Sequence, residues 1–113
     1  MTREEFIAIL DRKRYSYEIE GDNIIVTYND DSRHRDVLLS KLTEIPPNVI
    51  FNNGGYVNLK SLNSVPRSVQ FNNGGYIHLK AIALGIYYLW PFEINNIDNK
   101  RIFNILIKRG IFE

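Results

Sequence analysis

Apolar residues recur with a period of twenty through the middle of the chain. The segments 36–50, 56–70 and 76–90 carry hydrophobic side chains at matching places. The matching sets are Val37, Val57 and Ile77; Leu39, Leu59 and Leu79; Leu42, Leu62 and Ile82; Ile45 and Val65; Val49 and Val69; Phe51 and Phe71. A fixed period with apolar positions in register is typical of stacked repeats, because each unit buries its hydrophobic face against the next. We therefore expect stacked coils.

The spacing inside one repeat predicts two short strands. Val57 and Leu59 alternate with polar residues, which indicates a strand over 56–60 with both side chains directed inward. Pro66 then bends the chain, and Val69 and Phe71 alternate again, which indicates a second strand over 69–72. Each strand is expected to pair with its copy in the next coil, about 4.8 Å away.

The ten-residue stretch FNNGGYVNLK at 51–60 returns as FNNGGYIHLK at 71–80. Asn-Gly-Gly is a turn signal, and we expect these glycines to adopt positive φ and to make each corner tight enough for stacking. Stacked amides would satisfy corner backbone groups that no strand reaches. The predicted structural corner consists of Asn52, Asn53, Gly54, Gly55, Asn72, Asn73, Gly74 and Gly75. A phosphate-cradling loop is the alternative, but no Lys-Ser/Thr follows and the segment enters a strand.

Both ends of the repeat region carry candidate caps. At the N-terminus, Thr2 and Glu5 have capping-box spacing before an amphipathic helix, and a hairpin follows with its turn at 21–23. At the C-terminus a closing helix is expected to end at Gly110. Its predicted buried stripe is Ile102, Phe103, Ile105 and Leu106.

Together these patterns predict an α+β fold in a single domain, 1–113. We expect a short β-solenoid with two strands per coil and about 2.5 coils over residues 36–90. An N-terminal helix and hairpin, 1–35, would cap one end, and a C-terminal helical cap, 91–113, would close the other.

Two stretches resemble known repeat proteins. LKSLNSVPRSVQF resembles the rhythm of short leucine-rich repeats, although the inserted NNGGYV adds a second strand to each coil and favours a β-solenoid. IPPNVIFNNGGYVNLKSL resembles repeats in small uncharacterised proteins of phages and their bacterial hosts. The second resemblance implies a phage accessory protein that binds and inhibits a host defence protein in the host cytoplasm.

Composition narrows the chemistry. The net charge of +1 gives no global attraction to nucleic acid or anionic membranes, and the absence of Cys excludes thiolate ligands and a Cys nucleophile. No apolar run reaches the roughly 18 residues of a membrane helix, so we expect a cytoplasmic protein. His34 and His78 have no partner at ligand spacing. We find no catalytic constellation and therefore expect a protein that is not an enzyme, with no metal and no cofactor.

Outward strand positions suggest a binding face. The candidates are Tyr56, Asn58, Lys60, Tyr76, His78 and Lys80, which recur at matching places and would form a ladder on stacked coils. Tyr supplies a large contact area at low entropic cost, and solenoid faces commonly bind macromolecules. A non-enzymatic protein-binding module is the leading hypothesis, and an ordinary solvated sheet face is the alternative.

Basic clusters carry a second functional hypothesis. Arg12, Lys13, Arg14, Arg33 and Arg35, with aromatic residues nearby, are candidates for nucleic-acid binding. Cations at a helix C-terminus also complement the helix dipole without any ligand. A homodimer through the aromatic stretch IYYLWPF near the C-terminus is a further hypothesis.

Overall fold

The computed structural model describes residues 1–29, 36–75, 77–79, 101, 104–105 and 107–110. The two sheets of this part follow the orders β1-β2-β4-β6 and β3-β5-β7. The elements are α1 (Arg3–Arg12), β1 (Tyr15–Glu20), β2 (Asn23–Asn29), β3 (Val37–Leu38), β4 (Val49–Phe51), β5 (Val57–Leu59), β6 (Gln70–Phe71) and β7 (Ile77–Leu79). The described chain is therefore α+β, as the sequence predicts.

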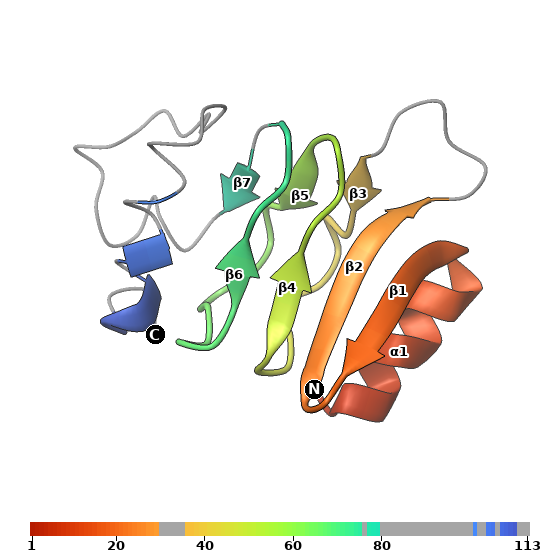
Figure 1. The fold of residues 1–113 in the computed structure, drawn as a ribbon, viewed down its shortest axis with the longest axis horizontal. Helices are drawn as coiled ribbons and strands as arrows, with labels where there is room; N and C mark the ends of the chain where they lie inside the picture. Colours follow the sequence, from red (N-terminus) through yellow and green to blue (C-terminus); the bar gives the residue numbers. More distant parts are fainter. Residues whose placement is uncertain (30–35, 76, 80–100, 102–103, 106, 111–113) are drawn as a thin grey trace.

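The two sheets lie in layers with the core between them. Figure 1 shows the strands stepping along the long axis of the molecule, from α1 and β1 at one end to β6, β7 and the C-terminal helical residues at the other. The inward side chains of β4 to β7 are fully buried or nearly so. They form one hydrophobic cluster with residues of α1 and β2.

Parallel pairing at an offset of twenty residues organises the repeat region. Val57 pairs with Val37 on one side and with Ile77 on the other. In the second sheet Phe51 pairs with Phe71, and their rings stack with centroids 5.0 Å apart and planes 8° apart. The predicted pairing of each strand with its copy in the next repeat is confirmed.

The second Asn of each pair occupies the interior of the corner. Asn53 and Asn73 are almost fully buried, whereas Asn52 and Asn72 are exposed. The Nδ2 group of Asn73 donates to the carbonyl of Gly75, 3.0 Å away, and to that of Gly55 in the preceding repeat, also 3.0 Å away. The amide therefore joins two layers through their backbone carbonyls, whereas the prediction gave both Asn of each pair this role.

The corner glycines serve close approach and not positive φ, so that part of the prediction is wrong. Among the described glycines, positive φ occurs at Gly21 and Gly110. A Cβ atom at Gly74 would lie 2.6 Å from the carbonyl oxygen of Gly54, and one at Gly75 would lie 2.8 Å from the carbonyl carbon of Gly55. Any side chain there would force the two layers apart.

The N-terminal helix begins as predicted. Thr2 and Glu5 form a complete capping box. The backbone N–H of Thr2, and then its hydroxyl, hold the pKa of the Glu5 carboxyl below its ordinary value. Phe6 and Leu10 are fully buried, so the helix contributes its apolar face to the core.

The hairpin does more than cap the repeats. Strand β2 pairs parallel with β4, with Ile24 opposite Val49 and Val26 opposite Phe51. The hairpin therefore extends the four-stranded sheet, and Ile24 and Val26 continue the buried rows. The periodic pattern does not predict this pairing, because its offset of twenty-five residues differs from the period of twenty.

The C-terminal helix is described in part. Residues 101, 104–105 and 107–108 are helical, and Gly110 has φ +74°, in agreement with its predicted role as the helix end. The predicted stripe is wrong at Ile105, which is 45% exposed, while Ile107 is fully buried. The other stripe residues, Ile102, Phe103 and Leu106, lie outside the described residues.

We predict that Phe51→Ala lowers the free energy of unfolding by about 3–5 kcal/mol, because it leaves a cavity beside Phe71 and ends the ring stack. Chemical denaturation followed by far-UV circular dichroism measures the change. Asn52→Ala, at the next and exposed position, is the control, with an expected change within about 0.5 kcal/mol. Equal effects of the two substitutions would contradict the stacked core.

Glycine substitutions test whether a position requires glycine because two backbone segments approach closely or because φ is positive. Gly74→Asn should cost at least about 1–3 kcal/mol, because no rotamer moves its Cβ away from the Gly54 carbonyl. Gly21→Asn should be tolerated, because φ is +62° there, nothing lies within 4 Å of the added Cβ, and Asn enters the left-handed region readily. Thermal unfolding of both variants measures this, and a stable Gly74→Asn protein would refute the steric account.

Candidate protein-binding face

The outward side of the three-stranded sheet carries a row of side chains at equivalent positions. Leu38 of β3 pairs with Asn58 of β5, which pairs with His78 of β7. Leu38 is 48% exposed, and Asn58 and His78 are half-buried. Because parallel strands lie about 4.8 Å apart, the three side chains form a short, regularly spaced line.

Polar contacts fix the surroundings of this row. The hydroxyl of Tyr56 lies 3.3 Å from Nδ1 of His78, and the backbone N–H of Tyr56 donates to Asp36 Oδ1 at 2.9 Å. The Oδ1 of Asn58 accepts the backbone N–H of Lys60 at 3.1 Å. Side chains from successive repeats are therefore held in one arrangement before any partner binds.

The underside of the row is rigid because its strands are fully packed. The residues that flank Asn58 in β5, Val57 and Leu59, are completely buried, as are Ile77 and Leu79 on either side of His78. Because inward and outward side chains alternate along each strand, each outward side chain lies between two residues that are packed in the core. Binding to this face would thus order few groups, which lowers the entropic cost of association.

Tyr15 protects the sheet edge at the end of the row. Its hydroxyl accepts the backbone N–H of Leu38 at 2.8 Å and donates to the Leu38 carbonyl at 3.3 Å. Strand β3 is the edge of its sheet, so one buried phenol satisfies both edge groups of this residue. Sequence reasoning placed Tyr15 in the hairpin but missed this contact, which spans twenty-three residues.

The structure brings together part of the predicted face. Tyr56, Asn58 and His78 lie together as expected, and Lys60 follows them as an exposed side chain. Tyr76 and Lys80 lie outside the described residues. Leu38, which the period places in the same row, adds the apolar component of the face.

The predicted basic clusters are only partly described. Arg12, Lys13 and Arg14 are exposed at and after the end of α1, while Arg33 and Arg35 lie outside the described residues. Asp11 and Tyr17 lie close to the first cluster, and the bond from the Tyr17 hydroxyl to the Asp11 carboxylate, with some burial, raises the pKa of that phenol. An acidic group thus stands beside these cations.

No family model, curated protein or solved structure matches this chain. The described residues hold no group of three or more His, Cys, Asp or Glu side chains placed to bind a metal ion, and His34 lies outside them. The helices in this part are too short or too polar to span a bilayer. Functional inference therefore rests on the geometry of the chain itself.

We predict that Tyr15→Phe destabilises the protein by about 1–2 kcal/mol, because the N–H and carbonyl of Leu38 lose their partner at a partly buried edge. Tyr17→Phe is the matched control, since its hydroxyl bonds an exposed carboxylate, and its cost should stay within about 0.5 kcal/mol. Hydrogen exchange adds a local readout: the Leu38 amide should exchange faster in Tyr15→Phe alone. Unchanged protection of that amide would show that the phenol is dispensable.

Proposed function

We propose that this chain is a small non-enzymatic protein-binding module built on a short β-solenoid, with residues 36–79 forming its two-strand coils. Parallel pairing at a constant offset of twenty residues in both sheets supports the architecture. A stacked scaffold of this kind presents a fixed surface and contributes contacts, not chemistry.

The observation that carries the functional proposal is the outward row of Leu38, Asn58 and His78. It combines an exposed aliphatic side chain with an amide and an imidazole, and Tyr56 stands beside it. Interfaces between proteins favour such mixtures of apolar, aromatic and neutral polar groups over charged ones. The three side chains of the row itself include no Asp, Glu, Lys or Arg, and Asp36 and the exposed Lys60 lie next to it.

The partner is proposed to be a protein with a complementary, largely uncharged patch. The resemblance to repeats of phages and their bacterial hosts favours a host protein, including a defence protein that the module would inhibit. A bacterial lysate is therefore the appropriate source in which to seek it.

Substitution of Leu38 tests the proposal. Leu38→Arg places a charge at the β3 end of the row and should weaken partner binding about tenfold or more. Ile19→Arg is the matched control, because Ile19 is an equally exposed aliphatic residue, 50% against 48%, on an edge strand of the other sheet. Immobilised protein, bacterial lysate and quantitative mass spectrometry identify the retained partner, and titration of that purified partner gives the affinity.

Three results bear on the outcome. Loss of the partner with Leu38→Arg and its retention with Ile19→Arg supports the proposal. Equal retention by both variants contradicts it. Retained material that nuclease removes and that dissociates steeply with salt would instead favour the nucleic-acid hypothesis.

A further inference from the structure

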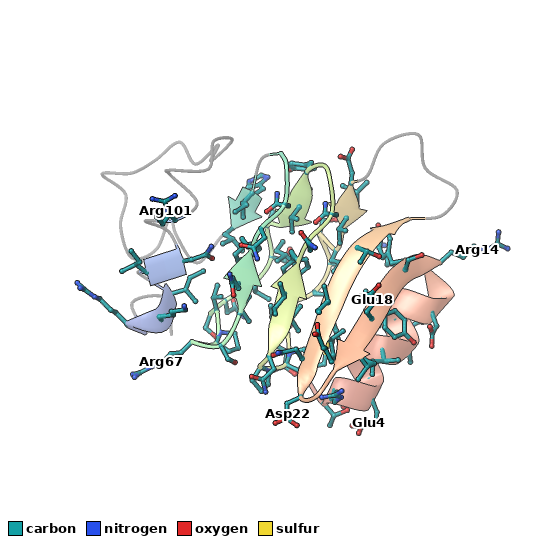
Figure 2. The ribbon with its side chains drawn as sticks, viewed as in Figure 1. Glu4, Arg14, Glu18, Asp22, Arg67 and Arg101 are labelled. Atoms are coloured by element: carbon teal, nitrogen blue, oxygen red, sulfur yellow. The ribbon has the colours of Figure 1, made fainter. Side chains whose placement is uncertain are left out.

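Charge is unevenly divided between the N-terminal and C-terminal parts of the chain. Residues 1–44 hold seven Lys and Arg but ten Asp and Glu, whereas residues 45–113 hold seven Lys and Arg but three Asp and Glu. Among the residues that the structure describes, 1–44 hold five Lys and Arg and eight Asp and Glu, whereas 45–110 hold five Lys and Arg and no Asp or Glu. Figure 2 shows Glu4 and Glu18 on the side of α1 and β1, with Arg14 farthest out there, Asp22 at the β1–β2 turn, and Arg67 and Arg101 on the opposite side of the molecule.

The acidic end, which we call the head, is the distal part of β1 and its turn. Glu18, Ile19 and Glu20 are all exposed, and Asp22 follows in the turn. The two Glu lie on one side of this edge strand and Ile19 on the other. Arg14 shares this end of the molecule but lies before the start of β1, away from the turn (Figure 2). The guanidinium of Arg3 lies at the turn itself, where it donates to the backbone carbonyls of Asp22 at 2.7 Å and Gly21 at 3.4 Å.

The basic end, which we call the tail, is a cleft between β6 and the C-terminal helical residues. Its volume is about 380 Å³, and its described ionisable lining residues are Arg101 and Lys108. Ile105, 45% exposed, lies four residues after Arg101 and three before Lys108, so the three side chains share one helix face. At the tail the isoleucine and the two cations share one face, whereas at the head Ile19 lies on the opposite side of β1 from the two Glu, so what relates the two ends is their opposite charge.

Strand continuation cannot join the two ends. Asn104 already occupies the edge of β6, where its Oδ1 accepts the Phe71 N–H at 2.9 Å and its Nδ2 donates to the Phe71 carbonyl at 2.8 Å. A contact at the tail must therefore be made by side chains against the helix and the cleft.

We infer that a second copy of this chain binds head to tail, with the acidic β1 edge of one molecule against the basic cleft of the next. The opposite charges of the Glu18 and Glu20 side of β1 and of the Arg101 and Lys108 face select this occupant. Such a contact uses different surfaces on the two molecules, so it is heterologous and extends beyond a dimer unless a ring closes. Exposed ion pairs are individually weak and salt-screened, so the association is weak and confined to low ionic strength.

Sedimentation at low ionic strength tests the inference. The mass of the wild-type protein should rise above 13.2 kDa with concentration, up to about 1 mM, and return to it on addition of salt. Glu18→Lys with Glu20→Lys disables the head, and Arg101→Glu with Lys108→Glu disables the tail. Each variant should remain monomeric. Asn63→Lys with Ser64→Lys, at exposed positions between β5 and β6, is the control for added positive charge and should associate like the wild type.

Mixing experiments identify the surfaces. The head variant has two basic ends and the tail variant has two acidic ends, so each should stay monomeric alone, whereas their mixture should associate as the wild type does. A chain with all four substitutions restores complementarity and should associate again, which also shows that the substituted surfaces still fold. Thermal unfolding of each variant provides the second measurement of folding.

Three results would overturn the inference. The first is a constant mass of 13.2 kDa for the wild type over the whole concentration range. The second is association of the head or tail variant equal to that of the wild type. The third is binding of a poly-glutamate peptide by the tail without self-association, which would identify an acidic partner in place of a second copy. Partner capture by the Leu38 face is independent of all three.

Discussion

Stacking of like residues on like, at a separation of twenty positions, is the constraint on which this structure depends. Backbone layers must approach closely enough for parallel hydrogen bonding, and at the corner they meet with no room for a Cβ atom at Gly74 or Gly75. Given that approach, the rings of Phe51 and Phe71 stack and the Asn73 amide reaches the carbonyl of the layer below. The same pairing register gives Leu38, Asn58 and His78 of the outward row their regular spacing.

Edges are the weakness of any open stack of strands, and this chain protects two of them by different chemistry. A phenol from the hairpin binds both backbone groups of Leu38, and an amide from the C-terminal helix binds both backbone groups of Phe71. Each group combines donor and acceptor, as a neighbouring strand would. The segments outside the repeats therefore contribute directly to the sheets, and their role is wider than the covering of apolar surface.

The contacts between equivalent residues of successive repeats could be predicted from the sequence. The pairing of Val57 with Ile77 and the meeting of Phe51 with Phe71 followed from the period, because identical units can bury their apolar faces only in register. At Gly74 sequence reasoning was correct about the tight corner that lets the repeats stack, and wrong only about positive φ, because both requirements select glycine. The contact between Tyr15 and Leu38 was also missed. Tyr15 belongs to the hairpin, which has no copy elsewhere in the chain, so the twenty-residue period carries no information about its partners. For the candidate face, sequence reasoning supplied the polar residues, and the pairing of Leu38 with Asn58 revealed the apolar one.

The interchangeable register of the repeats has a consequence for how such a chain changes over generations. An in-frame duplication of one unit adds a layer whose faces already match its neighbours above and below. The hairpin would still pair with the first layer and Asn104 with the last, so neither terminus has to be reinvented. The number of repeats can then change by one whole unit at a time, and each added unit adds one side chain to the outward row.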